Sequence, residues 1–268
     1  MKYKILVLDV DGTLTNSEKQ ISEKTKKALM HAQKKGVKLV IASGRPTFGV
    51  MPFVKELEME KYGGYVLSFN GAKITDCKTG KIMYEDSISP EMVPAIYDIS
   101  KKHGVNILTY EGDTVITETL DDEYLQIELR INKMSAKKVD NFKDYVKFSV
   151  PKFIMLGDGD YLGKIEPDVA GKLSGLNVYR SEPFFLEVMP QNIDKAYSLG
   201  RLLEKLGLSK DEMIACGDGF NDKSMIMFAG LGVAMENAQP PVKEVADYIT
   251  LSNNHDGIAK VVEEFILA

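Results

Sequence analysis

Asp9 and Asp11 stand at the end of the first apolar run of the chain, which begins at Tyr3. Residues i and i+2 of an extended segment point the same way, so both carboxylates are expected to face one pocket. Gly12 allows the sharp exit that a side chain would obstruct. Like charges this close need a cation or a shared proton, and Mg²⁺ prefers such oxygen ligands. The alternative interpretation is an ordinary turn, since Asp and Gly favour turns.

A second acidic cluster, Gly217-Asp218-Gly219-Phe220-Asn221-Asp222, follows the apolar run Met213–Cys216. It again places carboxylates between a predicted strand and a predicted helix. Asp218 could supply a third carboxylate to a metal bound by the first pair. The alternative is that Asn221 or Asp222 only caps the following helix.

Two further sites could hold an anion. Ser43-Gly44-Arg45 lies between a predicted strand and a helix that begins near Pro46, which offers a hydroxyl, backbone amides and a positive helix end. Lys195 lies where a helix begins, and a nearby anion would explain a cation at that end. The alternatives are a plain helix cap for Ser43 and a solvated surface lysine for Lys195.

Apolar runs typical of buried parallel strands position these clusters, with amphipathic helices between them. In open α/β sheets, ligands gather at the carboxyl ends of such strands. The predicted strands are 3–10, 37–42, 65–69, 213–216, 231–234 and 248–250, and the predicted helices are 22–35, 46–57, 195–206, 221–228 and 240–245. A hairpin is predicted around Ile74 and Ile82.

The middle of the chain has a different character, because alternating strands there are mixed with helices, as in an α+β domain. The predicted helices are 90–103, 122–132, 136–146 and 159–173, and the predicted strands are 105–110, 114–118, 153–156, 176–180 and 184–188. We therefore expect a discontinuous α/β domain, 1–85 with 188–268, and an α+β insert, 86–187.

Composition excludes several classes of function. The 268 residues carry a formal net charge of −5, which argues against nucleic acid or an anionic membrane as the main partner. The longest apolar run near the N-terminus is interrupted by Asp9 and Asp11, so we expect neither a signal peptide nor a membrane span, and a cytoplasmic protein. The two cysteines, Cys77 and Cys216, lie far apart and indicate no disulfide framework or zinc site.

The four clusters, in this order, resemble the four motifs of the haloacid dehalogenase superfamily. Asp9 to Thr13 is similar to the first motif, Ser43 to the second, Lys195 to the third and the 217–222 segment to the fourth. Further matches resemble the Cof-type subfamily over nearly the whole chain. They are Ser43-Gly44-Arg45, Asn70-Gly71-Ala72, Asn237-Ala238, Ala246-Asp247 and Asp256-Gly257. Ala196, where glycine is frequent, and Ser43, where threonine is also common, depart from the pattern without removing a needed group.

This resemblance implies a Rossmann-like core with a large C2-type cap inserted between the second and third motifs. It implies that Asp9 attacks phosphorus to form an aspartyl phosphate, and that Asp11 acts as general acid and then general base. Mg²⁺ is expected on the Asp9 carboxylate, the Asp11 backbone carbonyl and Asp218, with Asp222 supporting the site.

Phosphate contacts follow from the same resemblance. Ser43, the Gly44 amide, Lys195 and Asn221 are expected to hold the transferring oxygens. Arg45 either contacts the substrate or forms an outward ion pair.

The expected activity is Mg²⁺-dependent hydrolysis of a small phosphate monoester, with sugar phosphates as the leading class and no protein partner implied. A phosphomutase of the same superfamily is one alternative, because it would use the same aspartyl phosphate. The other is a non-catalytic module that binds Mg²⁺ and a phosphorylated metabolite.

Overall fold

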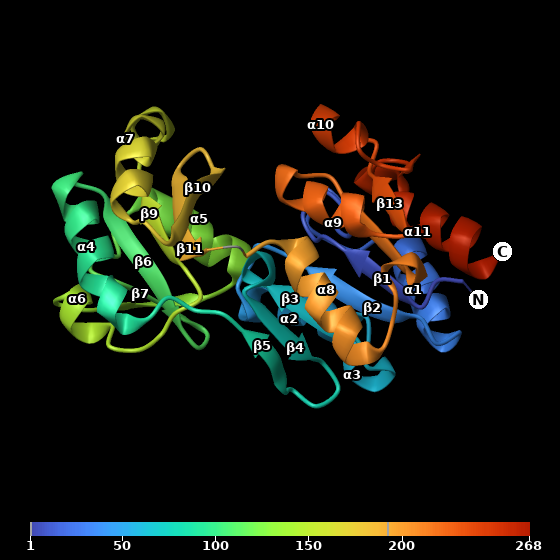
Figure 1. Ribbon diagram of the computed structural model, residues 1–268. Helices are drawn as coiled ribbons and strands as arrows, with labels where there is room; N and C mark the ends of the chain where they lie inside the picture. Colours follow the sequence, from blue (N-terminus) through green and yellow to red (C-terminus); the bar gives the residue numbers. More distant parts are fainter. Residues whose placement is uncertain (1, 192) are drawn as a thin grey trace. The chain divides into compact units, whose positions relative to one another are not determined.

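The protein folds into two compact units, which we describe separately in this computed structural model (Figure 1). The structure describes residues 2–191 and 193–268. One unit comprises Met1–Tyr84 and Asp194–Ala268, and the other comprises Glu85–Ile193. The sequence predicted that the chain returns from the second unit to the first at residue 188. The strand Phe185–Pro190 instead pairs with its neighbour through Pro190, which keeps residues 188–190 with the second unit.

The discontinuous unit is built on an eight-stranded sheet whose order is β14-β13-β12-β1-β2-β3-β4-β5. Every pairing from β14 to β3 is parallel, and β4 pairs antiparallel with β3. The strands are β1 (Ile5–Leu8), β2 (Lys38–Ala42), β3 (Tyr65–Ser68), β4 (Lys73–Asp76), β5 (Ile82–Glu85), β12 (Met213–Gly217), β13 (Leu231–Ala234) and β14 (Tyr248–Ile249). The α/β class and the parallel core are therefore confirmed.

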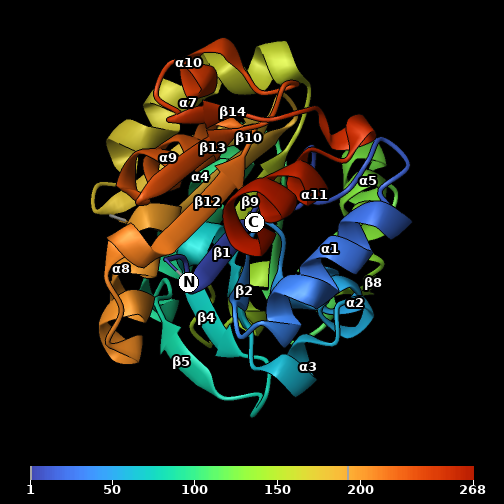
Figure 2. The ribbon, with the colours of Figure 1, turned by 90° about the vertical axis from the view of Figure 1, so that its right-hand side faces the viewer.

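Helices cover both faces of this sheet, because its central strands are apolar on both sides. Leu6 and Leu8 pack in one cluster with residues of three helices, α1 (Glu23–Lys34), α2 (Thr47–Glu56) and α11 (Gly257–Val262). Ile5 and Val7 pack in another cluster with residues of α8 (Lys195–Leu206) and α9 (Lys223–Phe228). Figure 2 shows α1 and α11 lying on one side of the sheet and α8 on the other. The strand ends consequently remain the place where polar side chains can meet.

Most helices of this unit follow the predicted ranges, but those at Met59–Tyr62 and Gly257–Val262 were not predicted. They are α1 (Glu23–Lys34), α2 (Thr47–Glu56), α3 (Met59–Tyr62), α8 (Lys195–Leu206), α9 (Lys223–Phe228), α10 (Pro240–Lys243) and α11 (Gly257–Val262). Shorter turns are η1 (Phe69–Gly71), η3 (Lys210–Glu212), η4 (Phe220–Asp222), η5 (Asn253–His255) and the π-helical η6 (Glu263–Leu267).

The second unit has a six-stranded sheet of order β10-β11-β9-β6-β7-β8. Its pairings are antiparallel except that of β7 with β8. The elements are η2 (Pro90–Met92), α4 (Val93–Lys102), β6 (Asn106–Glu111), β7 (Thr114–Thr117), α5 (Glu123–Asn132), β8 (Ser135–Lys138), α6 (Phe142–Tyr145), β9 (Phe153–Leu156), α7 (Gly159–Lys172), β10 (Leu176–Glu182) and β11 (Phe185–Pro190). Apolar residues of α4, α6 and α7 pack on one face of this sheet.

The predicted helix 136–146 is wrong in its first half. Residues Ser135–Lys138 form β8 at the edge of the sheet, where Ala136 is in register with Val115. Ladder hydrogen bonds to β7 thus outweigh the high helix propensity of Ala and Lys in this segment. The helical part shortens to Phe142–Tyr145, which Asn141 caps through Asp144 N.

We expect Ser22→Ala to lower the free energy of unfolding by about 1 kcal/mol, because Ser22 caps α1. Its Oγ accepts from Thr25 N at 3.1 Å and donates to the carboxylate of Asp256 at the start of α11. Chemical denaturation would measure the loss. Ser174→Ala, at an exposed position, is the control and should stay within about 0.5 kcal/mol of wild type. Equal stability of the two variants would contradict this role of the cap.

Within the described residues, no helix is both long enough and apolar enough to cross a membrane.

Candidate active site

Asp9 lies at the carboxyl end of β1, directly between β12 and β2. Its backbone N–H donates to Cys216 O at 3.1 Å, and its own carbonyl accepts from Leu14 N at 3.1 Å, which closes the turn after the strand. The residue is 7% exposed. Gly12 has φ +81°, and a Cβ there would overlap the carboxylate of Asp218, so the turn requires glycine.

Lys195, the first residue of α8, lies between two carboxylates. Its Nζ donates to Asp9 Oδ1 at 2.7 Å and to Asp222 Oδ1 at 2.6 Å, and Lys195 and Asp222 are both fully buried. Burial alone would lower the pKa of the ammonium, but the charges of Asp222 and Asp9 raise it above its ordinary value. The interpretation of Lys195 as a solvated surface lysine is therefore wrong.

Asp222 holds the loop after β12 together. Its Oδ2 accepts from the backbone N–H groups of Asp218 and Gly219, both at 2.9 Å, while its Oδ1 accepts from Lys195. A Cβ on Gly217 would overlap the Asp222 side chain, so a glycine is needed there too. Asp222 thus connects the first residue of α8 with the loop after β12.

Asp9, Asp218 and Asp222 each offer a carboxylate oxygen, and these atoms lie within 4.8 Å of one another. Burial, together with the charge of Asp222, raises the pKa of Asp9 well above its usual range. Burial also raises the pKa of Asp218 to about 6, although the hydrogen bond from Thr13 opposes this. The donor set is therefore all oxygen and short of positive charge, which fits a hard divalent cation such as Mg²⁺.

Thr13 was not predicted as a site residue. Its Oγ1 donates to Asp218 Oδ1 at 2.7 Å, and the side chain is buried. A hydroxyl directly after the Asp-x-Asp-Gly turn was the available signal. Its contact joins the turn after β1 to the loop after β12.

The side chain of Asp11 points to a different set of partners. Arg45 Nε donates to Oδ2 and Arg45 Nη2 to Oδ1, each at 2.7 Å, and Lys19 Nζ also donates to Oδ1 at 2.7 Å. Burial would raise the pKa of Asp11, but these two cations lower it below its ordinary value. Arg45 is 9% exposed and forms this ion pair with Asp11, whose side chain is 37% exposed.

Ser43 and Gly44 follow β2, the strand beside β1. Ser43 is buried, and its Oγ accepts from Arg45 N at 3.2 Å. Gly44 packs closely against the side chain of Asn70, whose Oδ1 also accepts from Asn221 Nδ2 at 3.0 Å. The loops after β2 and β12 therefore converge on Asn70.

Asn70, which the sequence predicted as part of a turn, contacts several of the loops that form the site. Phe69 and Asn70 both have positive φ, 52° and 53°, and their N–H groups donate to Arg45 O and Ser43 O. Ser198 Oγ of α8 donates to Gly71 O at 2.7 Å, which joins the same turn to the helix that carries Lys195. Strained backbone of this kind persists only where surrounding contacts hold it.

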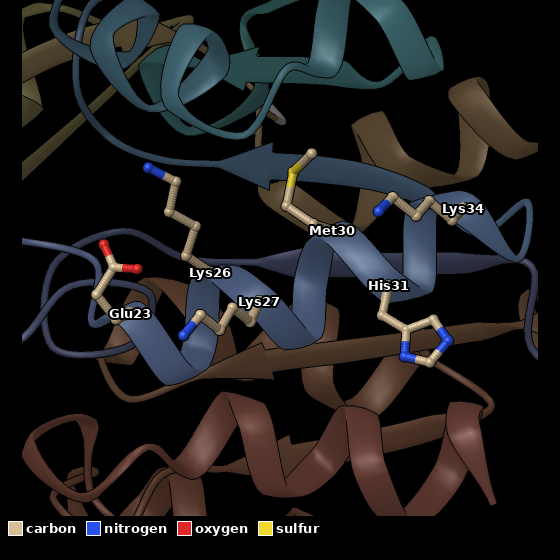
Figure 3. Close-up of a pocket in the computed structure, with 6 residues that line it drawn as sticks. All are labelled: Glu23, Lys26, Lys27, Met30, His31 and Lys34. Atoms are coloured by element: carbon tan, nitrogen blue, oxygen red, sulfur yellow. The ribbon is translucent and has the colours of Figure 1, made fainter.

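A shallow hollow of about 490 Å³ lies elsewhere in this unit, along α1 (Figure 3). It is lined by Glu23, Lys26, Lys27, Met30, His31 and Lys34. Figure 3 shows these side chains spreading outward from the exposed part of the helix. None of the predicted site residues is among them, so the hollow is not the candidate active site.

Comparisons with known proteins agree with this geometry. The family model of haloacid dehalogenase-like hydrolases matches residues 6–262. The chain is 32% identical over 271 residues to 5-amino-6-(5-phospho-D-ribitylamino)uracil phosphatase YcsE of Bacillus subtilis, which covers 98% of this chain and 96% of the relative.

Two solved structures extend the comparison. A haloacid dehalogenase-like hydrolase from Bacteroides thetaiotaomicron has a TM-score of 0.95 and 47% identity, covering 98% of this chain and all of its own. The HAD subclass IIB sugar phosphatase BT4131 has a TM-score of 0.84 and 27% identity, and the match covers 99% of this chain and 100% of the BT4131 chain. The chain therefore belongs to the haloacid dehalogenase-like hydrolases and is a phosphoric monoester hydrolase of that family.

Proposed function

We propose that this enzyme is a Mg²⁺-dependent phosphatase that attacks small phosphate monoesters with the carboxylate of Asp9. The observation that carries the proposal is the placement of this buried carboxylate at a strand end, with Lys195 on Oδ1. Among the hydrogen bonds of the described residues, none reaches Asp9 Oδ2. That oxygen attacks phosphorus to form an aspartyl phosphate, which water then hydrolyses.

Four groups bind the transferring oxygens in this proposal: Ser43, the Gly44 amide, Lys195 and Asn221. Support comes from Lys195, which already contacts Asp9, and from the shared contact of Gly44 and Asn221 with Asn70. Phosphoryl transfer depends mainly on positioning and charge stabilisation, which these groups supply.

The metal ligands in this proposal are Asp9, Asp218 and the backbone carbonyl of Asp11. Asp222 supports them, because both of its carboxylate oxygens already accept hydrogen bonds from Lys195 and from the loop after β12. A bound Mg²⁺ supplies positive charge that lets an anionic substrate approach an anionic nucleophile. Thr13 orients Asp218 through its hydroxyl.

Asp11 is the proposed general acid and base. It protonates the leaving oxygen in the first displacement and takes a proton from the attacking water in the second. In the structure its carboxylate is held by Arg45 and Lys19. Arg45 is thus proposed to orient Asp11 and to reach the substrate from the same side.

The proposed substrates are sugar phosphates, and the second unit, Glu85–Ile193, is the proposed C2-type cap that supplies part of the specificity. Support for this class comes from the related sugar phosphatase BT4131. The related YcsE is named for a substrate with a phosphorylated ribityl chain, which is also a polyhydroxylated phosphate ester.

Phosphate release from a panel of sugar phosphates, nucleotides and phosphorylated cofactors tests the proposal, with Mg²⁺ or with excess chelator. We expect chelation to lower the rate by at least about a hundredfold, because the metal contributes several kcal/mol of charge stabilisation. Readdition of Mg²⁺ should restore it. Unchanged release in chelator would contradict metal dependence. Isomerised sugar phosphate without free phosphate would indicate a mutase, and tight binding without turnover a binding module.

A further inference from the structure

Lys19 lies outside the four clusters that define the proposed site, yet its Nζ contacts Asp11 Oδ1 at 2.7 Å. Its side chain is 56% exposed, so the ammonium is accessible to a ligand. Lys19 also has φ +60°, a backbone region that residues other than glycine seldom adopt. A strained residue whose cation contacts a proposed acid and base therefore has a candidate role in the reaction.

The loop that carries Lys19 is held by several contacts. Asn16 Oδ1 accepts from the N–H groups of Glu18 and Gln20, and Asn16 O accepts from Lys19 N at 3.0 Å. Contacts with the loop before α11 fix its beginning. Asn253 Nδ2 donates to Thr15 O at 2.9 Å, and Ser17 N donates to Asn254 Oδ1 at 2.9 Å. The position of Lys19 is thus set by its backbone, not only by its ion pair.

The two cations on Asp11 differ in how firmly they are held. Arg45 is 9% exposed, donates two hydrogen bonds to the carboxylate and has its guanidinium 5.7 Å from the centre of the Phe53 ring. Lys19 makes a single contact through a flexible, exposed side chain. Lys19 is therefore the cation that can exchange partners without disturbing the packed interior.

The net charge of Asp11, Arg45 and Lys19 favours contact between Lys19 and a bound anion. Asp11 offers one negative charge to the positive charges of Arg45 and Lys19, so the trio carries an excess of one positive charge. A phosphate dianion bound beside Asp9 brings two negative charges to the end of β1, two residues from Asp11.

We propose that Lys19 is a further substrate-binding residue, which moves from Asp11 to the phosphoryl group when a phosphate ester binds. This inference rests on the proposed function of the same site. The exchange leaves Oδ1 of Asp11 with one donor, Arg45, and transfers a charge-assisted hydrogen bond to the ligand. No covalent bond changes in this step.

Binding of inorganic phosphate in the presence of Mg²⁺, measured by calorimetry, tests the inference without requiring turnover. We expect Lys19→Met to weaken phosphate binding about tenfold and to raise KM by a similar factor, while kcat changes by less than about threefold. Lys19→Arg should restore both constants. Lys61→Met is the matched control and should have no effect, since Lys61 is also an exposed lysine, at 67%, in an ion pair with Glu58.

Unchanged phosphate affinity in Lys19→Met would overturn the inference and leave Lys19 as a surface ion pair. A loss of kcat with unchanged affinity would also overturn it, because Lys19 would then act only through Asp11. If wild type binds phosphate but hydrolyses no ester, the proposed function fails while the affinity comparison still decides the role of Lys19.

Discussion

Asp9→Asn is expected to lower phosphate release by more than about a thousandfold with every substrate that wild type hydrolyses. The amide has nearly the shape of the carboxylate but lacks the anionic oxygen that attacks phosphorus. Lys195 keeps its second partner, Asp222, at 2.6 Å, so the substitution leaves no buried cation unpaired. The fold should therefore survive while the chemistry is lost.

Steady-state phosphate release in Mg²⁺ measures the activity of wild type and Asp9→Asn, and circular dichroism checks that both proteins are folded. Asp98→Asn is the control, because Asp98 is 63% exposed and pairs with Lys143 on the surface of the second unit. It should hydrolyse at the rate of wild type. If Asp9→Asn keeps more than about a tenth of the wild-type rate, Asp9 is not the nucleophile.

Lys195→Met is expected to lower both stability and activity. The substitution removes the cation from between Asp9 and Asp222 and leaves two buried carboxylates without it. Removing one partner of a buried ion pair typically costs about 3–5 kcal/mol, and a similar loss in the free energy of unfolding is expected here. Phosphate release should fall by at least about a hundredfold, because a phosphate-binding cation is lost.

Chemical denaturation in chelator measures the stability term, and the same experiment in Mg²⁺ should show a smaller loss, since a bound cation replaces part of the missing charge. Because the pKa of Lys195 is raised on folding, its contribution is complete at neutral pH and fades only as pH rises above the ordinary lysine range.

Lys4→Met serves as the matched control for Lys195→Met. Lys4 is 52% exposed and pairs with Glu212 at 2.6 Å on the surface, where such pairs contribute about 0–1 kcal/mol. Equal losses in the free energy of unfolding of the two variants would contradict a larger stabilisation by the buried ion pairs of Lys195 than by a surface pair.

Local sequence patterns were sufficient for the core and for the residues at its strand ends. Apolar runs such as Ile5–Leu8 indicate buried parallel strands, and a parallel sheet brings their carboxyl ends to one edge. That rule predicts that Asp9, Ser43 and Asp218 lie near one another. The edge strand β8 escaped prediction, because Ala and Lys have no strong strand preference and only pairing with β7 makes the segment extended.

The partners of those residues could not be read from local patterns. Asp9 and Lys195 are 186 residues apart, and Thr13 and Asp218 are 205 apart, so no hydrophobic period or turn signal connects them. Lys19 in its left-handed position resembles any surface lysine in the sequence. Whether a cation contacts Asp9 or Asp11 depends on where packed helices and loops place its side chain, and that placement follows from long-range packing.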